Sequence, residues 1–349
     1  VAIGKSALTT QNAGADGYNV AVGYEAGKAI TTGIKNTIVG GIAGDAITTG
    51  LNNTLLGYNS GGALVGGSYN VALGYFALAS EDAHGRNVAI GWRSLQNQNA
   101  GADAYNVAIG YDSGLSISTG TLNTIVGGLA GDALTTGAQN TAIGHEALST
   151  EDTGARNTAI GEGSLKTLNF DGNGYNVAVG YNSGHLISTG VNNTIIGSLA
   201  GDALTTGSNN VAIGKGALST EDANGYNVAI GHQTLKVQNA GSDAYNVAVG
   251  YDAGVSVTTG VNNTLVGSFS GDALTTGVSN VALGYAALSS AQTSNYNTAI
   301  GERALHSNVN SNRNTAVGFQ ALYSHTIGSA TDSYNTAVGY AAGGAVTTG

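Results

Sequence analysis

The chain has 349 residues, of which 57 are glycine and 9% are charged, and its formal net charge at pH 7 is −10. A hydrophobic content of 42% is enough for a buried core and excludes a disordered chain. The acidic balance argues against nucleic acid as a partner, the absence of cysteine excludes disulfides, and no apolar run reaches the ~20 residues that a membrane-spanning helix needs.

One five-residue pattern recurs along the whole chain: Asn, then Val or Thr, a small or aliphatic residue, Ile, Val or Leu, and Gly. Residues 176–180, Asn-Val-Ala-Val-Gly, are one copy, and residues 1–4 form a copy without its Asn. The other copies begin at Asn19, Asn36, Asn53, Asn70, Asn87, Asn106, Asn123, Asn140, Asn157, Asn193, Asn210, Asn227, Asn246, Asn263, Asn280, Asn297, Asn314 and Asn335.

The spacing of these copies predicts the fold. Most copies are 17 residues apart and, through the middle of the chain, every fourth spacing is 19, which gives a 70-residue super-repeat. This period is too short for two-helix repeats, and Val, Ile and Thr between Gly, Asn, Asp and Ser are typical of strands between turns. We predict an all-β parallel β-solenoid of about 20 coils of 17–19 residues, with two short strands per coil, as a single domain over residues 1–349.

Alternation along the motif strand predicts two faces. The second and fourth positions share one face, which we expect to line the interior of the coil, and the third position then points outward. The third position is usually Ala, but it is a large aliphatic residue in several coils, and we predict that a neighbouring chain covers it. The alternative is that these are ordinary exposed aliphatic residues. The predicted oligomer interface comprises Ile38, Leu55, Ile125, Ile195 and Leu265.

Stacking of identical coils also places identical residues in columns. We expect the Asn side chains to form a hydrogen-bonded ladder, and the motif Gly to serve a corner that needs positive φ or close approach. These structural columns include Asn36, Asn106, Asn176, Asn246, Gly40, Gly110, Gly180 and Gly250. Two tyrosine columns, one before the Asn and one after the Gly, are expected to pack at corners, and a sugar-binding stripe is the alternative. Their members include Tyr18, Tyr105, Tyr175 and Tyr245, and Tyr24, Tyr111, Tyr181 and Tyr251.

Acidic residues are the best candidates for a chemical site, and they also fall into columns. Asp45, Asp132, Asp202 and Asp272 follow a Gly in one coil type, whereas Glu-Asp pairs begin at Glu81, Glu151 and Glu221 in another. Copies in a column are mostly four coils apart, too far to share one ion or one glycosidic bond. We expect turn carboxylates that accept backbone N–H bonds, with Arg86 and Arg156 near the pairs.

We find no pattern that predicts an enzyme. The six histidines are scattered without a cysteine partner, and the glycine-rich 40–44 lacks the Lys-Ser/Thr of a phosphate loop. Every coil has siblings of its own type, whereas a catalytic coil should differ from the others. We therefore predict no catalytic residue, no cofactor and no metal ligand.

Coils such as Asn140 to Leu148, Asn-Thr-Ala-Ile-Gly-x-x-Ala-Leu, resemble the head repeats of trimeric autotransporter adhesins, the YadA-like family, and are similar to repeats of phage tail-fibre proteins. The resemblance covers essentially the whole chain and implies a left-handed parallel β-roll, three chains around an axis and a role in attachment. The chain departs from that family in its longer coils and in lacking the neck, the coiled-coil stalk and the membrane-anchoring barrel.

These observations predict a structural, fibre-forming surface protein: an adhesin head or an extracellular filament segment, with a phage tail-fibre segment as the alternative. A carbohydrate-acting β-helix enzyme and an ice-binding solenoid are weaker alternatives. The expected partners are further copies of the chain, as a homotrimer or an end-to-end polymer, and a host or matrix surface ligand, without nucleic acid or membrane insertion. Neither end carries a polar cap, so we expect a fragment of a longer fibre, located outside the cell or on a virion surface.

Overall fold

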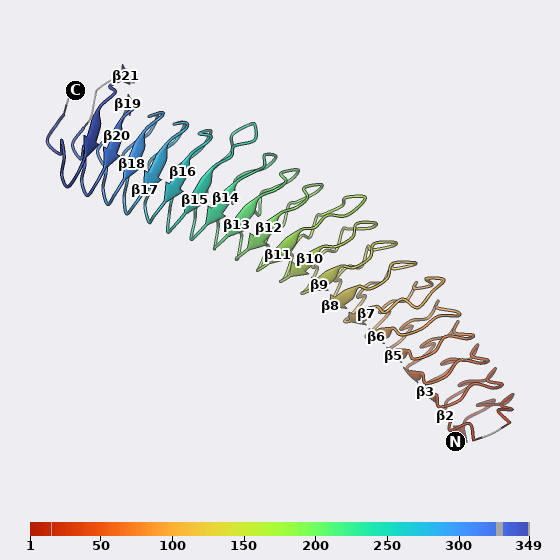
Figure 1. Ribbon diagram of the computed structural model, residues 1–349. Helices are drawn as coiled ribbons and strands as arrows, with labels where there is room; N and C mark the ends of the chain where they lie inside the picture. The colour runs from red at the N-terminus through yellow and green to blue at the C-terminus, as the bar shows by residue number, and fades with distance from the viewer. Residues whose placement is uncertain (15, 326–330, 348–349) are drawn as a thin grey trace. The chain divides into compact units, whose positions relative to one another are not determined.

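A computed structural model describes residues 1–14, 16–325 and 331–347 (Figure 1). The chain divides into two compact units, Val1–Tyr175 and Asn176–Gly349, and each is described by itself. The single domain expected over residues 1–349 stays a prediction. The residues described contain no helix long and apolar enough to cross a membrane.

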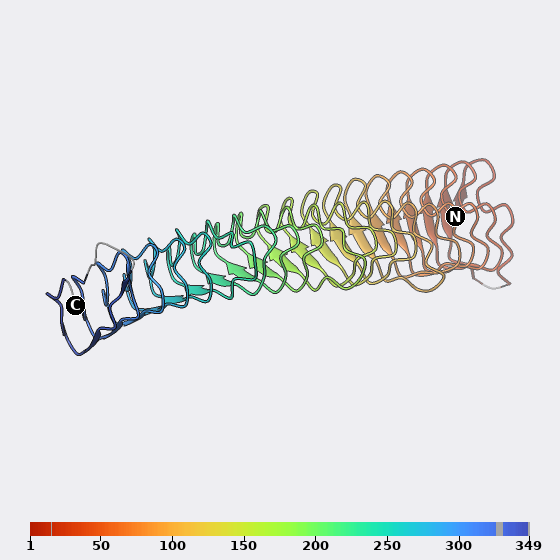
Figure 2. The same cartoon turned by 90° about the horizontal axis from the view of Figure 1, so that it is seen from above.

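The first unit is a stack of coils joined by one parallel sheet. Each strand pairs in register with the strand of the next coil, so that Thr141 lies beside Thr158 and Ala142 beside Ala159. Seen from above in Figure 2, the coils follow one another as loops. The strands of this unit are β1 (Ala2–Ile3), β2 (Val20–Val22), β3 (Thr37–Val39), β4 (Thr54–Leu56), β5 (Val71–Leu73), β6 (Val88–Ile90), β7 (Val107–Ile109), β8 (Thr124–Val126), β9 (Thr141–Ile143) and β10 (Thr158–Ile160).

The second unit repeats this arrangement. A short second sheet, in which Ser311 pairs with Thr331, joins two of its coils. The strands of its main sheet are β11 (Val177–Val179), β12 (Thr194–Ile196), β13 (Val211–Ile213), β14 (Val228–Ile230), β15 (Val247–Val249), β16 (Thr264–Val266), β17 (Val281–Leu283), β18 (Thr298–Ile300), β20 (Thr315–Val317) and β22 (Thr336–Val338), and the short sheet consists of β19 (Ser311–Asn312) and β21 (Thr331–Asp332). The predicted all-β parallel β-solenoid is confirmed.

The prediction of two strands in each coil is wrong, because most coils contribute a single three-residue strand. The rest of the coil turns too often to form a second one. In the coil that begins at Asn193, Leu199, Gly201 and Asn209 all have left-handed φ angles, of 57°, 51° and 61°. Residues in this region turn the chain and cannot continue a strand.

An asparagine column joins the coils at the start of each strand. The backbone N–H of Asn210 donates to Oδ1 of Asn193 at 2.9 Å, and Nδ2 of Asn193 donates to the Gly207 carbonyl at 2.9 Å. Asn193 itself donates its N–H to Oδ1 of Asn176 at 3.0 Å. The Asn193 side chain thus binds the next coil and closes its own. The ladder residues Asn36, Asn106, Asn176 and Asn246 close their coils in the same way.

The motif glycine allows the coils to approach closely. Gly180 has a φ of 139°, and a Cβ atom built there would lie 2.6 Å from the carbonyl oxygen of Gly197 in the next coil. No side chain fits in that space, so a coil that is followed by another needs Gly at this corner. Gly40, Gly110 and Gly250 have φ angles between 141° and 143° and meet the same obstacle.

The two faces of the strand are the reverse of those predicted. Ile195, at the third position of its motif, has no exposed surface, whereas its neighbour Ile196 is 38% exposed. The third position therefore points into the core, and the second and fourth positions form the outer face. The prediction of an oligomer interface at Ile38, Leu55, Ile125, Ile195 and Leu265 is corrected accordingly, since all five are fully buried within a single chain.

Large third-position residues are accommodated by glycine elsewhere in the coil. A Cβ atom on Gly201 would lie 2.9 Å from Cδ1 of Ile195 and 2.9 Å from Cδ1 of Leu204. Ile195 and Leu204 fill this coil, and both are fully buried. The glycine makes room for two aliphatic side chains that a larger residue would displace.

The next coil fills the same space differently. It has Ala212 on the strand, Leu218 where the previous coil has its glycine, and Glu221 where the previous coil has Leu204, and all three are fully buried. Leucine supplies the volume in the middle of this core. The carboxylate of Glu221 then lies at the end of the core.

We predict that Asn193→Ala destabilises the second unit by roughly 2–5 kcal/mol, because the buried Asn210 N–H and Gly207 carbonyl both lose their partner. Urea unfolding followed by circular dichroism measures this loss. Asn239→Ala, at an exposed residue of the same unit, is the matched control and should change stability by less than about 0.5 kcal/mol. Equal losses for the two variants would contradict the ladder's role.

The reversal of faces is tested by two adjacent substitutions on β12. Ile195→Lys places a charge in the core and should destabilise the unit by at least about 3 kcal/mol. Ile196→Lys places the same charge on the outer face and should cost about 1 kcal/mol or less within one chain. Unfolding of the two variants under conditions where the protein is monomeric decides between the faces, and a larger loss at Ile196 would restore the original assignment.

Candidate functional site

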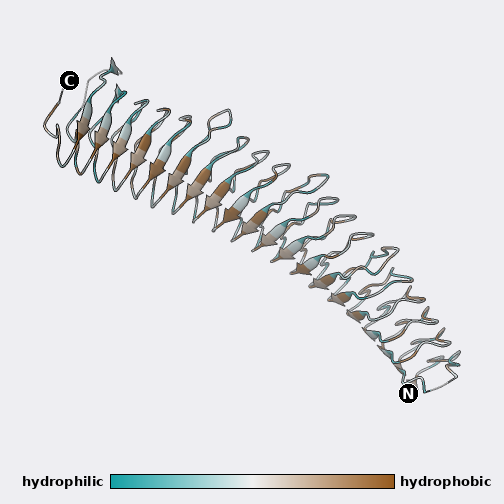
Figure 3. Ribbon diagram, in the orientation of Figure 1, coloured by the Kyte–Doolittle hydropathy of each residue, from teal (hydrophilic) through white to brown (hydrophobic). Residues whose placement is uncertain are grey.

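The outer face of the sheet is uncharged and carries an aliphatic column. The second motif position is Val or Thr and the fourth is Ile, Val or Leu in every copy. Figure 3 shows the arrows of the main sheet mostly in white to brown, whereas the short strands β19 and β21 are teal. Within a single chain several of these side chains are well exposed; they include Leu56 at 48%, Ile109 at 37%, Ile196 at 38%, Val281 at 39% and Leu283 at 45%. Contiguous apolar surface of this kind is typical of interaction sites.

The tyrosine column before the Asn lies on the exposed surface and includes arginine. The Arg86 guanidinium lies between the rings of Tyr69 and Tyr105, 5.6 and 5.4 Å from their centroids. Nη1 of Arg86 donates to the Tyr105 hydroxyl at 2.9 Å. These three residues line a shallow pocket of about 460 Å³. Because arginine lies against the faces of Tyr69 and Tyr105, packing accounts for these two rings.

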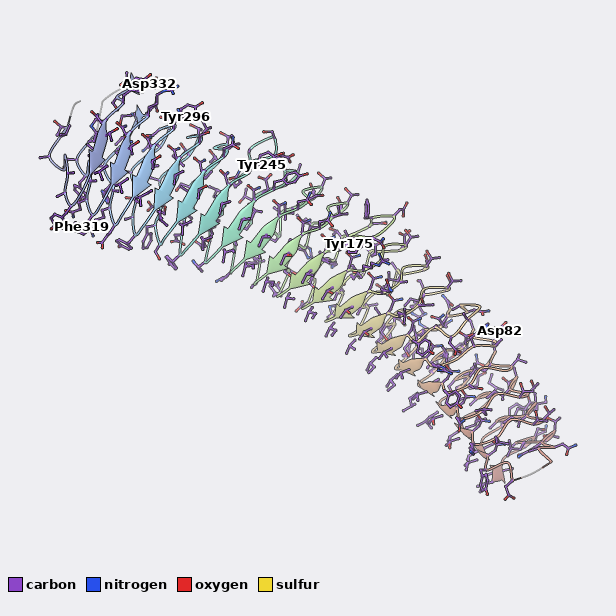
Figure 4. The ribbon with its side chains drawn as sticks, in the orientation of Figure 1. Asp82, Tyr175, Tyr245, Tyr296, Phe319 and Asp332 are labelled. Carbon is purple, nitrogen blue, oxygen red and sulfur yellow. The ribbon has the colours of Figure 1, made fainter. Side chains whose placement is uncertain are left out.

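The other members of this column lie at the same corner. Figure 4 shows Tyr175 in the first unit, and Tyr245 and Tyr296 in the second, on the margin away from the strand arrows. Tyr175 is 49% exposed, and its hydroxyl accepts a bond from Nη1 of Arg156 at 2.6 Å. The remaining predicted residues are also exposed: Tyr18, Tyr105 and Tyr245.

The tyrosine column after the Gly forms stacks along the other margin of the coils, where Figure 4 labels Phe319. Tyr58 stacks on Tyr75 with centroids 5.5 Å apart, and Tyr75 stacks on Trp92 at 4.2 Å. In the second unit Phe319 stacks on Tyr340 at 5.2 Å. The predicted members of this column, Tyr24, Tyr111, Tyr181 and Tyr251, are each about half exposed.

The aspartate column consists of partly buried carboxylates. Burial raises the pKa of Asp45, Asp132, Asp202 and Asp272, and hydrogen bonds from backbone amides oppose this shift. Oδ1 is enclosed without a hydrogen-bond partner in Asp132, Asp202 and Asp272. The four carboxylates remain in separate coils.

The three glutamates are fully buried at the end of the core, and burial raises the pKa of each. Glu151 is well satisfied, since Oε1 accepts from the N–H groups of Gly154 and Asp152 at 2.7 and 3.1 Å, and Oε2 accepts from Phe170 N–H at 3.2 Å. The glutamates are thus turn carboxylates. The arginines expected beside them bind elsewhere: Arg86 to Asp103 at 2.9 Å, and Arg156 to Gln139 at 2.8 Å.

One glutamate differs from its siblings because a histidine follows it three residues later. Glu81, Asp82 and His84 each offer a ligand atom, and these atoms lie within 4.8 Å of one another. The sequence prediction of no metal ligand overlooked this group, because the histidines and the acidic pairs were considered separately. The signal was the short Glu-Asp-x-His segment at residues 81–84.

The other described histidines do not form such a group. Nδ1 of His232 lies 3.3 Å from Asp252 and Nδ1 of His145 lies 3.9 Å from Glu146, both at the surface. Burial lowers the pKa of His306 and His325. His306 stacks on Tyr323 with centroids 5.0 Å apart.

Comparison with known proteins adds no family. No family model matches the chain, and a search of curated proteins finds no match. The likeness to adhesin and tail-fibre repeats therefore depends on the repeat pattern of the sequence.

The raised pKa values predict a pH-dependent effect of Asp132→Asn, Asp202→Asn and Asp272→Asn combined. A carboxyl whose pKa is raised by folding destabilises the protein once it is ionised, so its cost appears as pH rises above the ordinary value near 4. The variant should therefore be more stable than the wild type at pH 7, and this advantage should shrink as pH falls toward about 4.

Thermal unfolding of both proteins across this pH range measures the difference. Comparing the two proteins at each pH removes the contributions of groups that do not interact with the three aspartates. Asp222→Asn, at an exposed position, is the control. A constant difference between pH 7 and pH 4 would contradict the assigned cause.

Proposed function

We propose that this chain is a structural, fibre-forming surface protein whose coils associate with further copies of the chain through the outer face of the sheet. The observation that carries the proposal is that this face is uncharged in every motif and always has Ile, Val or Leu at the fourth position. Half-exposed side chains such as Leu283, at 45%, gain about 25 cal/mol for each Å² of apolar surface that is covered. Repetition from coil to coil multiplies a small gain per residue.

A second copy is the partner that this face fits best. Two identical sheet faces present the same columns of Val, Thr, Ile and Leu at the same spacing, and no charge opposes their approach. The likeness to adhesin head repeats implies three such chains around an axis. The proposal thus retains the predicted homo-oligomer and replaces the third motif position with the second and fourth.

The repeated architecture supports a mechanical or adhesive role in preference to catalysis. The acidic side chains recur in separate coils, and the glutamates are directed toward backbone amides of their own turns. We propose an extracellular location and attachment to a host or matrix surface. A phage tail-fibre segment remains the alternative, because the same solenoid serves either setting.

Light scattering coupled to size exclusion tests the association. The wild-type protein should have a mass that is a multiple of 34.4 kDa, and three chains are expected. Combined Ile109→Lys, Ile196→Lys and Leu283→Lys should reduce the mass to that of one chain while β-type circular dichroism persists, since each lysine lies on the outer face.

The matched control places three lysines at exposed residues outside the motif strands: Val65→Lys, Leu122→Lys and Leu186→Lys. This variant carries the same added charge and should keep the wild-type mass. A monomeric wild type, or an outer-face variant that keeps its mass, would refute association through the sheet.

A further inference from the structure

The turn at residues 81–84 brings three different ligand side chains together. Glu81 is fully buried, Asp82 is exposed and His84 is partly exposed. Nδ1 of His84 lies 3.8 Å from Oε1 of Glu81, too far for a hydrogen bond. Two ligands of one small cation are separated by a similar, slightly shorter distance, so a small side-chain rotation would bring both into contact with an ion.

Two enclosed atoms of this group lack hydrogen-bond partners, although Oε1 of Glu81 accepts the backbone N–H of His84 at 3.2 Å. Oε2 of Glu81 and Nδ1 of His84 are both shielded from solvent, and neither has a hydrogen-bond partner. Leaving a buried polar atom without a partner costs about 1–3 kcal/mol. The nearest arginine does not satisfy them, because Nε of Arg86 pairs with Asp103 at 2.9 Å. Glu81 is thus a buried ligand that faces an unused imidazole nitrogen.

The sister turns show what the same glutamate does without histidine. In the turn of Glu221, Asn224 donates both its N–H and its Nδ2 to Oε1, at 3.2 and 2.8 Å, whereas Oε2 is buried without a partner, as it is in Glu81. In the turn of Glu151, three backbone N–H groups satisfy both carboxylate oxygens. The backbone N–H at this position donates to the glutamate in both turns, but the Nδ2 donor of Asn224 is replaced by an imidazole in the turn of Glu81.

We propose that Glu81, Asp82 and His84 bind a divalent transition-metal ion of the Zn²⁺ class. Imidazole with two carboxylates suits Zn²⁺ and its neighbours, whereas Ca²⁺ and Mg²⁺ prefer oxygen ligands alone. Three protein ligands leave a fourth position for water or for an outside group, because Asp82 lies at the surface (Figure 4). The ion would neutralise the buried carboxylate and fix the turn.

The chain supplies its own matched variants for the test. Residues 81–84 read Glu-Asp-Ala-His and residues 221–224 read Glu-Asp-Ala-Asn. His84→Asn therefore converts the first turn to a sequence that the chain already folds. Asn224→His performs the opposite conversion, and both turns are followed by a Gly whose N–H donates to an aspartate, Asp103 or Asp243.

Isothermal titration of the metal-free full chain with Zn²⁺ should show one tight site per chain, with Ca²⁺ and Mg²⁺ unable to compete at equal concentration. His84→Asn should weaken the affinity at least about tenfold, while Asn224→His should add a second site. His145→Asn, at a surface His–Glu pair, should leave the titration unchanged. Co²⁺ in place of Zn²⁺ should give visible absorption that the His84→Asn variant lacks.

Other outcomes overturn the proposal. Absence of a stoichiometric Zn²⁺ site, equal affinity in His84→Asn, or loss of binding in His145→Asn alone would each show that this turn is not the site. Circular dichroism of every variant establishes that the coils remain folded. The titration counts ions per chain, so its result does not depend on whether chains associate through the sheet.

Discussion

The asparagine column is the interaction on which the rest of the structure depends. Most of these Asn side chains accept a backbone N–H from the next coil and close their own coil through a carbonyl 14 residues later, as Asn193 does with Gly207. A carboxylate could not donate the second bond, and a serine could not reach both groups. The bond fixes the register of the strand that follows. Once register is fixed, the glycine corner can bring adjacent backbones into contact and the side chains elsewhere are free to vary.

The periodic features of the fold were predictable, because they depend on residues that recur in every coil. The Asn and Gly columns and the parallel stack belong to this class. Alternation alone did not predict which face of the strand points into the core, since both positions on either side carry apolar residues. The information lay outside the motif, where Gly201 and Leu204 in one coil give way to Leu218 and Glu221 in the next. Where a larger residue at one position compensates for a smaller residue at another, both positions line the same core, and this identifies the inner face.

The candidate metal ligands were missed for a related reason. A glutamate in a polar Glu-Asp segment is expected to be exposed to solvent. Glu81 instead occupies the buried position that an aliphatic side chain, such as Leu204, has in another coil. Burial came from the position in the coil and not from the residue type. Only when the turn closes does His84 face that carboxylate, and sequence spacing alone does not show such a closure. The prediction of a second strand in each coil was wrong for a similar reason. The left-handed backbone conformation of residues such as Leu199 cannot be recognised from the residue type, leucine.

Most hydrogen bonds between coils join residues that are only about 16 to 21 positions apart in the chain. Such short separations give a very low relative contact order, which is associated with rapid folding. A coil therefore needs only its predecessor as a template and can dock while later coils are still being synthesised. The asparagine bonds are alike in most coils and do not select which coil a new coil docks on. The alternation between coils with Gly and coils with Leu in the middle of the core does select it. Coils that are 70 residues apart share both features, so deletion of one whole block would leave adjoining surfaces that still match.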